Sequence, residues 1–308
     1  MAEVLVTGGC GFIGRAVVHQ LVSAGHEIRI LDNLHYSASA AQPSGVDFIR
    51  GSTASKEELA AAMRGVDRCI HLAGSPVLEM PRDTRADESS QFNSHAEMFF
   101  SLAADQGVPV VYASSAAVYG ELEVDLIGEH VTLQPVNAHG MEKAALEHAA
   151  VASVASGGPT AVGLRMFNVY GPGQSSHSPY CSVVRLFADR LVRGLPIGIR
   201  GTGNQQRDFV YVDDAARAIV IAAFAPVRGA PVVNICTGRA ITLKEVVGEL
   251  ESATGLSAEI DMDPAGDPGV ARSVGRPDLA RELLGFEAEV DFRSGIQCMM
   301  AELVGNSA

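Results

Sequence analysis

Short apolar runs alternate with amphipathic stretches through the first half of the chain. The strand candidates are "EVLVTGG", "EIRILDN", "VDFIRGS", "DRCIHLAG" and "VPVVYASS". Helical periodicity marks three segments between these strands: "FIGRAVVHQLVSAG", a stretch from about Ser55, and "SSQFNSHAEMFFSLAADQG". Strands that are apolar almost without interruption are buried on both faces, as in parallel sheets. The pattern therefore predicts an α/β fold, a doubly wound parallel sheet with right-handed crossovers.

The second half is less regular. From about Arg165 the chain runs through "LRMFNVYGPGQSSHSPY", which is rich in Gly, Pro and Ser, and helix and strand signals then return unevenly. Ligands of open parallel sheets bind outside the carboxyl ends of the strands, where a second lobe would cover them. We predict a Rossmann-like cofactor-binding domain from 1–165 plus about 208–238. A smaller α/β substrate-binding lobe would comprise about 166–207 plus 239–308.

Composition narrows the class of protein. The 308 residues are 47% apolar and 19% charged, which suits a well-buried globular enzyme. A formal charge of −13 argues against a nucleic-acid partner, which normally requires a basic face. No apolar run reaches the roughly 20 residues of a membrane helix, and "MAEVLVTGG" lacks signal-peptide features, so we expect a cytoplasmic protein without membrane partners.

The cysteines point away from metal chemistry. The five are scattered, with no CxxC pair and no close histidine at ligand spacing, so we expect no metal site. They are interpreted as buried, small apolar residues.

A glycine-rich turn follows the first strand. In "TGGCGFIG", Gly8, Gly11 and Gly14 lead into a helix, where backbone N–H groups can meet a pyrophosphate. The second strand ends at Asp32, 18 residues beyond Gly14, close to the spacing of the acid that binds an adenosine ribose. A carboxylate there accepts hydrogen bonds from ribose hydroxyls and repels a 2′-phosphate. NAD is therefore favoured over NADP as the cofactor.

These motifs, with "LDNL", "HLAG", "YASSAAVYG", "GMEKAALE", "LRMFNVYGPGQ" and "GNQQRDFVYVDDAARA", occur in the order typical of one family. The chain resembles the extended short-chain dehydrogenase/reductase superfamily, and within it the NAD-dependent epimerases and dehydratases. Its motifs are most similar to those of the UDP-glucose 4-epimerase type. The resemblance implies a homodimer, paired through helices around 92–105 and 138–152, and a nucleotide sugar as the small-molecule substrate.

The resemblance also implies a set of NAD-binding positions along the carboxyl edge of the sheet. Besides the glycines and Asp32, they are Phe12, Ile13, Asn33, Ser52, Thr53, Leu72, Ala73, Ser114 and Lys143.

Three residues match the family's reactive positions. Ser115 corresponds to its substrate-facing hydroxyl, and Lys143, one of only three lysines, to the lysine that holds the nicotinamide ribose. The family's catalytic tyrosine precedes that lysine by four residues, and here His139 stands in its place. None of the six tyrosines has a lysine four residues on. A histidine titrates near ~6.5 against ~10 for tyrosine, so it can accept a proton near neutrality, although its ring is shorter.

The implied reaction is epimerisation through transient oxidation to a keto sugar. Dehydratases of this family carry an Asp-Glu pair after the hydroxyl residue, whereas Ala116 and Ala117 occur here. Two alternatives stay open, the second of them because the tyrosine is absent. One is a ketoreductase of a nucleotide sugar or natural-product intermediate, and the other is a catalytically silent NAD-bound sensor or scaffold.

Two further positions match family residues that meet the substrate's diphosphate, Asn168 and Arg207. A second departure concerns the nucleotide. Relatives carry an Arg-Pro-Gly-Asp segment, and the corresponding residues here begin with Gly266, so that arginine is missing. Arg272 and Arg276 are candidates to replace it.

Overall fold

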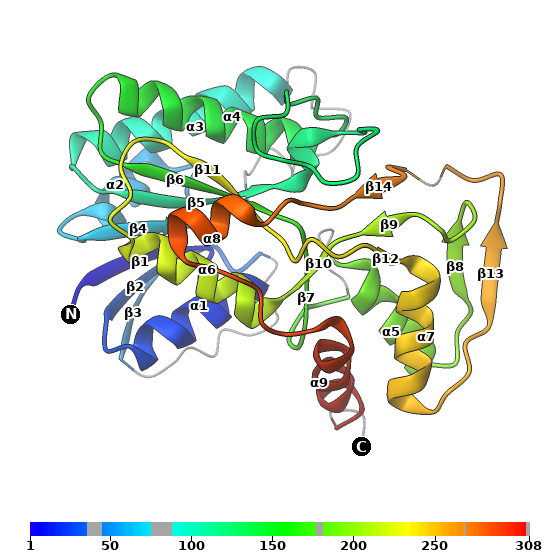
Figure 1. The fold of residues 1–308 in the computed structure, drawn as a ribbon. Coiled ribbons are helices and arrows are strands. Elements are labelled where there is room, and N and C mark those ends of the chain that lie inside the picture. The colour runs from blue at the N-terminus through cyan, green and yellow to red at the C-terminus, as the bar shows by residue number, and fades with distance from the viewer. Residues whose placement is uncertain (36–44, 75–87, 177–180, 268, 306–308) are drawn as a thin grey trace.

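A seven-stranded parallel sheet forms the larger part of the molecule (Figure 1). The computed structural model describes residues 1–35, 45–74, 88–176, 181–267 and 269–305. The strand order is β11-β6-β5-β4-β1-β2-β3, which reverses beside β1 as a doubly wound sheet requires. The bounds are β1 Glu3–Thr7, β2 Glu27–Asp32, β3 Val46–Arg50, β4 Arg68–His71, β5 Val110–Ser115, β6 Ala161–Met166 and β11 Val232–Ile235.

Side chains that alternate along each strand contribute to two hydrophobic cores, one on each face of the sheet. In β1, Val4 and Val6 join the core on one face of the sheet, whereas Leu5 joins the core on the other. All three side chains are fully buried. Successive strand side chains point to opposite faces, so a strand covered on both sides is apolar at every position. The continuous apolar runs of the sequence have this cause.

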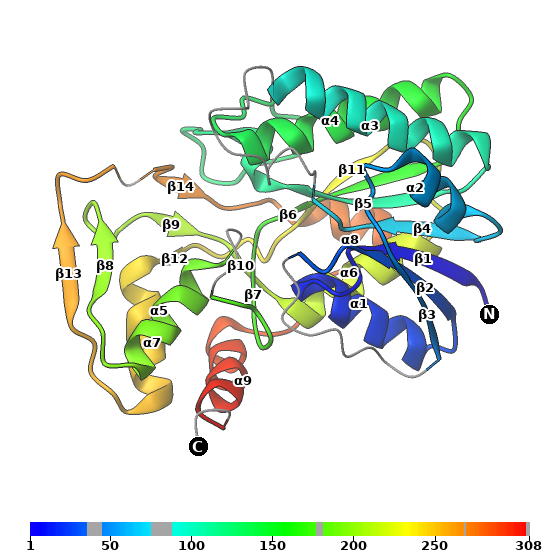
Figure 2. The same ribbon diagram turned by 180° about the vertical axis from the view of Figure 1, so that it is seen from behind.

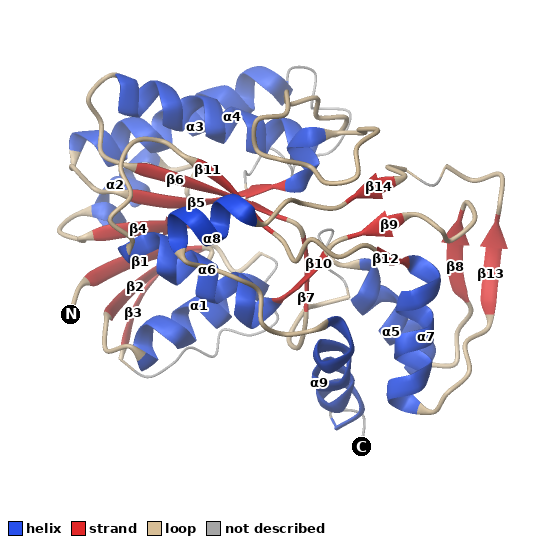
Figure 3. Cartoon of the chain, viewed as in Figure 1, coloured by secondary structure: helices blue, strands red, loops and turns tan. Residues whose placement is uncertain are grey.

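Helices cover both faces of the sheet (Figures 1 and 3). On one face lie α1, α6 and α8, and on the other lie α2, α3 and α4. Their bounds are α1 Phe12–Ser23, α2 Lys56–Met63, α3 Glu88–Asp105, α4 Ala138–Ala155, α6 Val212–Phe224 and α8 Asp278–Leu284. The predicted start near Ser55 is confirmed, because the Ser55 side chain caps α2 by accepting a hydrogen bond from the Glu58 N–H.

A smaller lobe with its own core stands at the carboxyl edge of the sheet. Its helices are α5 Val183–Val192, α7 Leu243–Thr254 and α9 Phe292–Gly305. Seen from behind, β9, β12 and β14 lie between the large sheet and the β8–β13 pair (Figure 2). The short strands are β7 Asn168–Tyr170, β8 Ile197–Arg200, β9 Gln206–Arg207, β10 Phe209–Tyr211, β12 Ile241–Thr242, β13 Ile260–Asp263 and β14 Arg272–Ser273.

The predicted fold class is confirmed, and the chain crosses between the two parts several times. β11 returns to the edge of the large sheet after the first small-lobe strands. Near the C-terminus α8 packs on β11 and α6, and its Ala280 and Leu284 join the core of the larger part. The predicted division of the sequence into two lobes stays a proposal. Because α8 packs on β11 and α6, we assign it to the Rossmann-like part. Within the described ranges, no helix combines the length and apolarity needed to cross a membrane.

Candidate active site

One cavity of about 650 Å³ lies where the carboxyl ends of β1, β2, β4 and β5 face the smaller lobe. Every residue predicted to bind the cofactor, to take part in catalysis or to meet the diphosphate lines it, although these residues come from segments far apart in the sequence. Those on the Rossmann side are Gly8, Gly11, Phe12, Ile13, Gly14, Asp32, Asn33, Ser52, Thr53, Leu72, Ala73, Ser114, Ser115, His139 and Lys143, and those from β7 and β9 are Asn168 and Arg207.

The glycine turn brings α1 against the end of β1. A Cβ on Gly14 would lie 2.2 Å from the carbonyl oxygen of Gly8, so any side chain there would push the helix away. Gly11 is the N-cap residue of α1, and having no side chain it leaves the first N–H groups of the helix without a side-chain cap. The first helix turn also contains no acidic residue. The helix N-terminus, with its positive dipole end, is thus suited to a phosphate group.

Asp32 ends β2 beside this turn and is buried. Its two carboxylate oxygens accept hydrogen bonds from the backbone N–H groups of Cys10 (2.9 Å) and Leu34 (2.8 Å). Each carboxylate oxygen can accept a second bond, so the group is fixed in place with capacity left for ribose hydroxyls. Leu34 has φ of 63°, a left-handed conformation that non-glycine residues seldom adopt. The cavity size, the glycine turn and this carboxylate together fit NAD.

The reactive end of the cavity is built where β5 meets α4. Ser115 ends β5, and its hydroxyl accepts a hydrogen bond from the Ala117 N–H at 3.1 Å, capping the short 3₁₀ helix η3 (Ala116–Tyr119). A Cβ on Gly140 would lie 2.5 Å from the carbonyl oxygen of Ala117. The glycine therefore lets the first turn of α4, which carries His139, approach η3, the segment that directly follows β5.

His139, Glu142 and Lys143 form a cluster on this turn. Glu142 Oε2 lies 3.7 Å from His139 Nδ1, and Glu142 Oε1 lies 3.2 Å from Lys143 Nζ. All three line the cavity. Burial alone would raise the pKa of the Glu142 carboxyl, but the neighbouring Lys143 and His139 outweigh it and lower the pKa to about 2. A carboxylate thus stands between the two basic side chains.

Glu142 was missed by the sequence reasoning. The signal was its position three residues after His139 and directly before Lys143, because residues three apart share a helix face.

Ser114 belongs to a buried network behind the cavity. Its hydroxyl donates to Glu147 at 2.5 Å, and Arg165 donates to both carboxylate oxygens of Glu147, at 2.9 and 2.7 Å. Arg165 also donates to the Tyr119 hydroxyl at 2.8 Å. The hydroxyl of Ser114 is therefore directed at Glu147, and the residue's predicted contact with NAD stays a prediction.

Arg207 and Asn168 enter the cavity from the smaller lobe. Arg207 is half-buried, and among the described residues no carboxylate lies within ion-pair distance of it. Burial lowers the pKa of its guanidinium. The Asn168 side chain donates to the carbonyl oxygen of Asp208. The Arg272 side chain instead donates to the carbonyl oxygen of Asp125, and it does not line the cavity.

No tyrosine among the described residues takes the place of the missing one. Tyr112, Tyr119, Tyr170 and Tyr211 are buried, and none of the four lines the cavity. The other two, at 36 and 180, lie outside the described residues.

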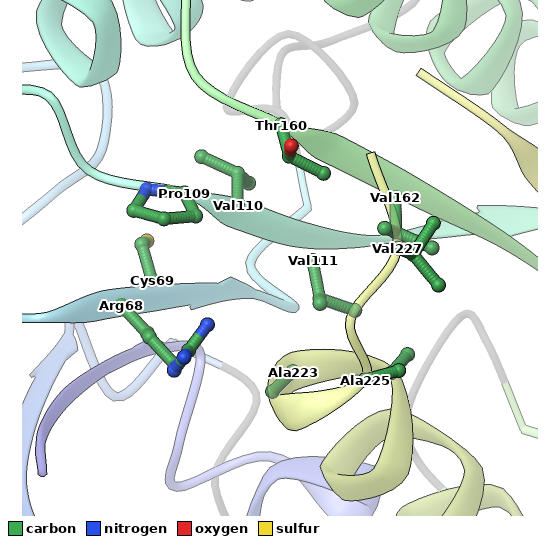
Figure 4. Close-up of a pocket in the computed structure, with 11 residues that line it drawn as sticks. Arg68, Cys69, Pro109, Val110, Val111, Thr160, Val162, Ala223, Ala225 and Val227 are labelled. Carbon is green, nitrogen blue, oxygen red and sulfur yellow. The ribbon is translucent and has the colours of Figure 1, made fainter. Parts of the chain in front are cut away.

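A second cavity, of about 140 Å³, lies at the opposite edge of the sheet (Figure 4). It adjoins the amino ends of β4 and β5, and Arg68, Cys69, Val110 and Val162 are among its mostly apolar lining residues. Burial raises the pKa of the Cys69 thiol. Because ligands of such sheets bind at the carboxyl ends, this void is a packing feature.

The interpretation of the cysteines as buried is only partly correct. Cys10, Cys69 and Cys236 are buried, whereas Cys181 is half-buried on the large cavity and Cys298 is exposed on α9. The buried face of α9 carries Ile296, Met299, Met300 and Leu303. Cys298 lies two residues after Ile296 and therefore on another side of the helix, so the prediction for it was wrong.

Comparisons with known proteins agree with this geometry. The model of the NAD dependent epimerase/dehydratase family matches residues 4–236. A UDP-glucose 4-epimerase of Azospirillum brasilense is 31% identical, over 96% of this chain and 89% of that protein. The solved structure of UDP-glucose 4-epimerase from Thermotoga maritima with UDP-glucose has a TM-score of 0.91 and 27% identity, covering 99% of this chain and 100% of that one.

A third similar protein is the UDP-glucose 4-epimerase of Thermus thermophilus, solved in complex with NAD. It has a TM-score of 0.86 and 31% identity, covering 98% of this chain and 99% of that chain. The matched segment of the family model spans the glycine turn, the carboxyl edge of the sheet and the α4 cluster. The chain belongs to the NAD dependent epimerase/dehydratase family.

Proposed function

We propose that this protein epimerises a nucleotide-linked sugar, in the manner of a UDP-hexose 4-epimerase. The observation that carries the proposal is the cavity in which Ser115, His139 and Lys143 meet both the glycine turn and Arg207. Bound NAD would take hydride from a sugar carbon and return it to the opposite face. The chain's own residues would hold the sugar and move the hydroxyl proton.

His139 is proposed as the group that accepts this proton. Its side chain is about one third exposed, which leaves it accessible from the cavity. Ser115 at the end of β5 would donate a hydrogen bond to the reacting oxygen. Lys143 is nearly buried beside Glu142 and would hold the ribose of the cofactor.

The nucleotide end of the substrate is proposed to lie against Arg207. A half-buried guanidinium without a carboxylate partner among the described residues favours an anionic ligand, and its paired donors suit a diphosphate. Both 4-epimerases of solved structure named above act on UDP-glucose according to their names.

Elimination is a poor alternative because Ala116 and Ala117 stand where the family's dehydratases carry an acid and a base. Both alanines belong to η3, directly after Ser115. Neither can transfer a proton.

The test is proton NMR of the purified holoenzyme with a panel of UDP- and dTDP-hexoses. Epimerisation predicts interconversion of two sugars without added cofactor. Consumption of NADH by a keto sugar, without interconversion, would indicate a ketoreductase. No reaction at all, with NAD bound, would favour a sensor or scaffold.

His139→Phe examines the role of the histidine. We expect loss of turnover by a factor of roughly 10² to 10⁴ with NAD retained. His19→Phe is the matched control, because His19 is exposed on α1, away from the cavity. Unchanged turnover in His139→Phe would remove His139 from the reaction.

We propose a homodimer through α3 and α4, in agreement with the resemblance. These helices pack on one another, and Met141 and Val151 of α4 are 41% and 51% exposed. Sedimentation equilibrium at micromolar concentration should give twice the chain mass, and Val151→Glu should shift it to the monomer. A wild-type monomer would refute the proposal.

A further inference from the structure

We infer that Glu142 is a positioning residue for His139, and that it fixes which ring nitrogen faces the substrate. The inference rests on the proposed function, because it explains how His139, the proton acceptor in that reaction, is oriented. Glu142 would accept a hydrogen bond from Nδ1–H of His139. The lone pair of Nε2 would then be available to take the substrate's hydroxyl proton.

The geometry of α4 supports this pairing. Glu142 follows His139 by three residues, so both side chains leave the helix on one face. Nδ1 and Oε2 lie 3.7 Å apart, beyond hydrogen-bond length but within reach of a small ring rotation. The other oxygen, Oε1, accepts from Lys143 at 3.2 Å. The carboxylate is thus held on one side by Lys143 and faces His139 on the other.

Burial distinguishes the two ring nitrogens of His139. Nδ1 is fully shielded from solvent, as is the Glu142 Oε2 that faces it. Yet 34% of the histidine side chain is exposed, and the residue lines the cavity. Because Nδ1 is shielded while the side chain still reaches the cavity, we infer that the opposite edge of the ring, which carries Nε2, faces the cavity. A neutral imidazole has one N–H donor and one acceptor, and a carboxylate at Nδ1 selects the tautomer whose acceptor is Nε2.

The charge of Glu142 suits this role. Its side chain is only 4% exposed. Without Glu142, the positive charge of Lys143 would disfavour protonation of His139. With the carboxylate between them, the imidazolium formed during the reaction is stabilised by an adjacent negative charge. Chemically, the substrate's O–H bond breaks and its proton goes to Nε2. Bound NAD would supply the hydride acceptor; on return, the hydride would come back to the opposite face of the keto sugar and Nε2 would give back the proton.

Other titratable groups face the cluster from neighbouring elements. His71, at the end of β4, hydrogen-bonds Thr7, and His95 on α3 hydrogen-bonds the carbonyl oxygen of Thr53. Burial lowers the pKa of both histidines, so both are neutral near pH 7. Glu147 is occupied by Arg165 and Ser114. Glu142 is therefore the ionised carboxylate directed at His139.

The first test reads the tautomer and does not depend on turnover. Holoenzyme labelled with ¹⁵N-histidine is examined at pH 8 by ¹⁵N–¹H correlation NMR, and His139 among the nine histidines is assigned from its loss in His139→Gln. We expect the Nδ1–H tautomer in the wild type and a mixture in Glu142→Gln. An Nε2–H tautomer in the wild type, or an unchanged tautomer in Glu142→Gln, would overturn the inference.

The second test is kinetic, on the sugar pair identified above. Glu142→Gln should lower kcat by about tenfold to a hundredfold with KM changed less than about threefold. The acidic limb of its kcat profile should move to lower pH, because the imidazolium loses its anionic neighbour. Glu142→Asp should recover part of kcat. Glu282→Gln, an exposed charge on α8, serves as the control.

Failure of the two proposals gives different results. If no sugar turns over but the tautomer responds to Glu142→Gln, the pairing stands and the epimerase proposal fails. If epimerisation proceeds and Glu142→Gln retains the wild-type kcat and pH profile, Glu142 only neutralises Lys143 and the inference is overturned. Circular dichroism and bound NAD confirm that each variant is folded.

Discussion

Arg165 and Glu147 form a two-point ion pair between the sheet and α4, with N–O distances of 2.9 and 2.7 Å. Arg165 comes from β6 and Glu147 from α4, and both side chains are almost fully buried. The same glutamate accepts a hydrogen bond from the hydroxyl of Ser114, which lines the cavity. The pair therefore ties the helix that carries His139 to the strand beneath it.

Arg165→Leu should destabilise the protein by about 3–5 kcal/mol, because it leaves Glu147 buried without its cation. Urea denaturation followed by circular dichroism measures the loss. The double variant Arg165→Leu with Glu147→Leu should recover part of it, since no lone buried charge remains. A single variant as stable as the wild type would contradict the importance of this pair.

Gly14→Ala should abolish NAD binding and lower the melting temperature, because the new Cβ would meet the Gly8 carbonyl oxygen at 2.2 Å. Gly248→Ala is the matched control. Gly248 lies inside α7 with no atom within 4 Å of its would-be Cβ, so alanine there should stabilise by up to about 1 kcal/mol. Equal effects of the two substitutions on melting would show that the close contact is unimportant.

Asp32→Asn should weaken NAD binding by roughly tenfold to a hundredfold, the value of one or two charge-assisted hydrogen bonds. Calorimetric titration of the cofactor-free protein measures it. Asp261→Asn, on the exposed strand β13, should bind like the wild type. If Asp32→Asn accepts NAD with undiminished affinity, the ribose lies elsewhere.

Arg207→Met should raise KM for the nucleotide sugar by about tenfold or more and change kcat less, because the arginine is proposed to bind a part of the substrate remote from the reaction. Arg228→Met, in an exposed loop, controls for loss of charge. A fall in kcat at constant KM would place Arg207 in the chemistry.

Glu142 gives a pH dependence of stability with a definite sign. Its pKa is lowered from 4.5 to about 2, so the folded state favours the charged form. The resulting stabilisation is present above pH 4.5 and is lost as the pH falls towards 2. At about pH 6 the wild type should exceed Glu142→Gln by up to about 3 kcal/mol, and the difference should shrink at about pH 3. A pH-independent difference in urea denaturation would contradict the assignment.

The first five strands of the large sheet and the helices α1, α2 and α3 could be predicted because each has a local signature, whereas β6 and β11 were not identified as strands. Ser55 caps α2 as expected, and the glycine turn after β1 adopts the expected geometry against α1. In the smaller lobe the strands β9, β12 and β14 have two residues each, too short for a periodic pattern. Their pairing follows from tertiary contacts that no local window contains.

The candidate site was predictable where both the type of a residue and its spacing match the requirements of dinucleotide binding. Asp32 and Gly14 have such spacing, and both line the cavity. The spacing of Glu142 from His139 was a usable signal, but a glutamate between methionine and lysine on a helix is ordinarily a solvated charge, so its burial was not expected. Its burial results from the packing of α4 against β5 and η3, and Gly140 allows the close approach to Ala117 of η3. The direction of the Ser114 hydroxyl likewise depends on Arg165 and Glu147.

The interleaved path of the chain limits how this enzyme can be re-engineered. Because β11 completes the large sheet after the smaller lobe has begun, no single cut in the chain separates the two parts. A chimera that borrows its sugar preference from a relative must transplant at least two distant segments together, one on each side of α6 and β11. Truncation after β6 would instead leave a sheet with an exposed apolar edge, prone to aggregation.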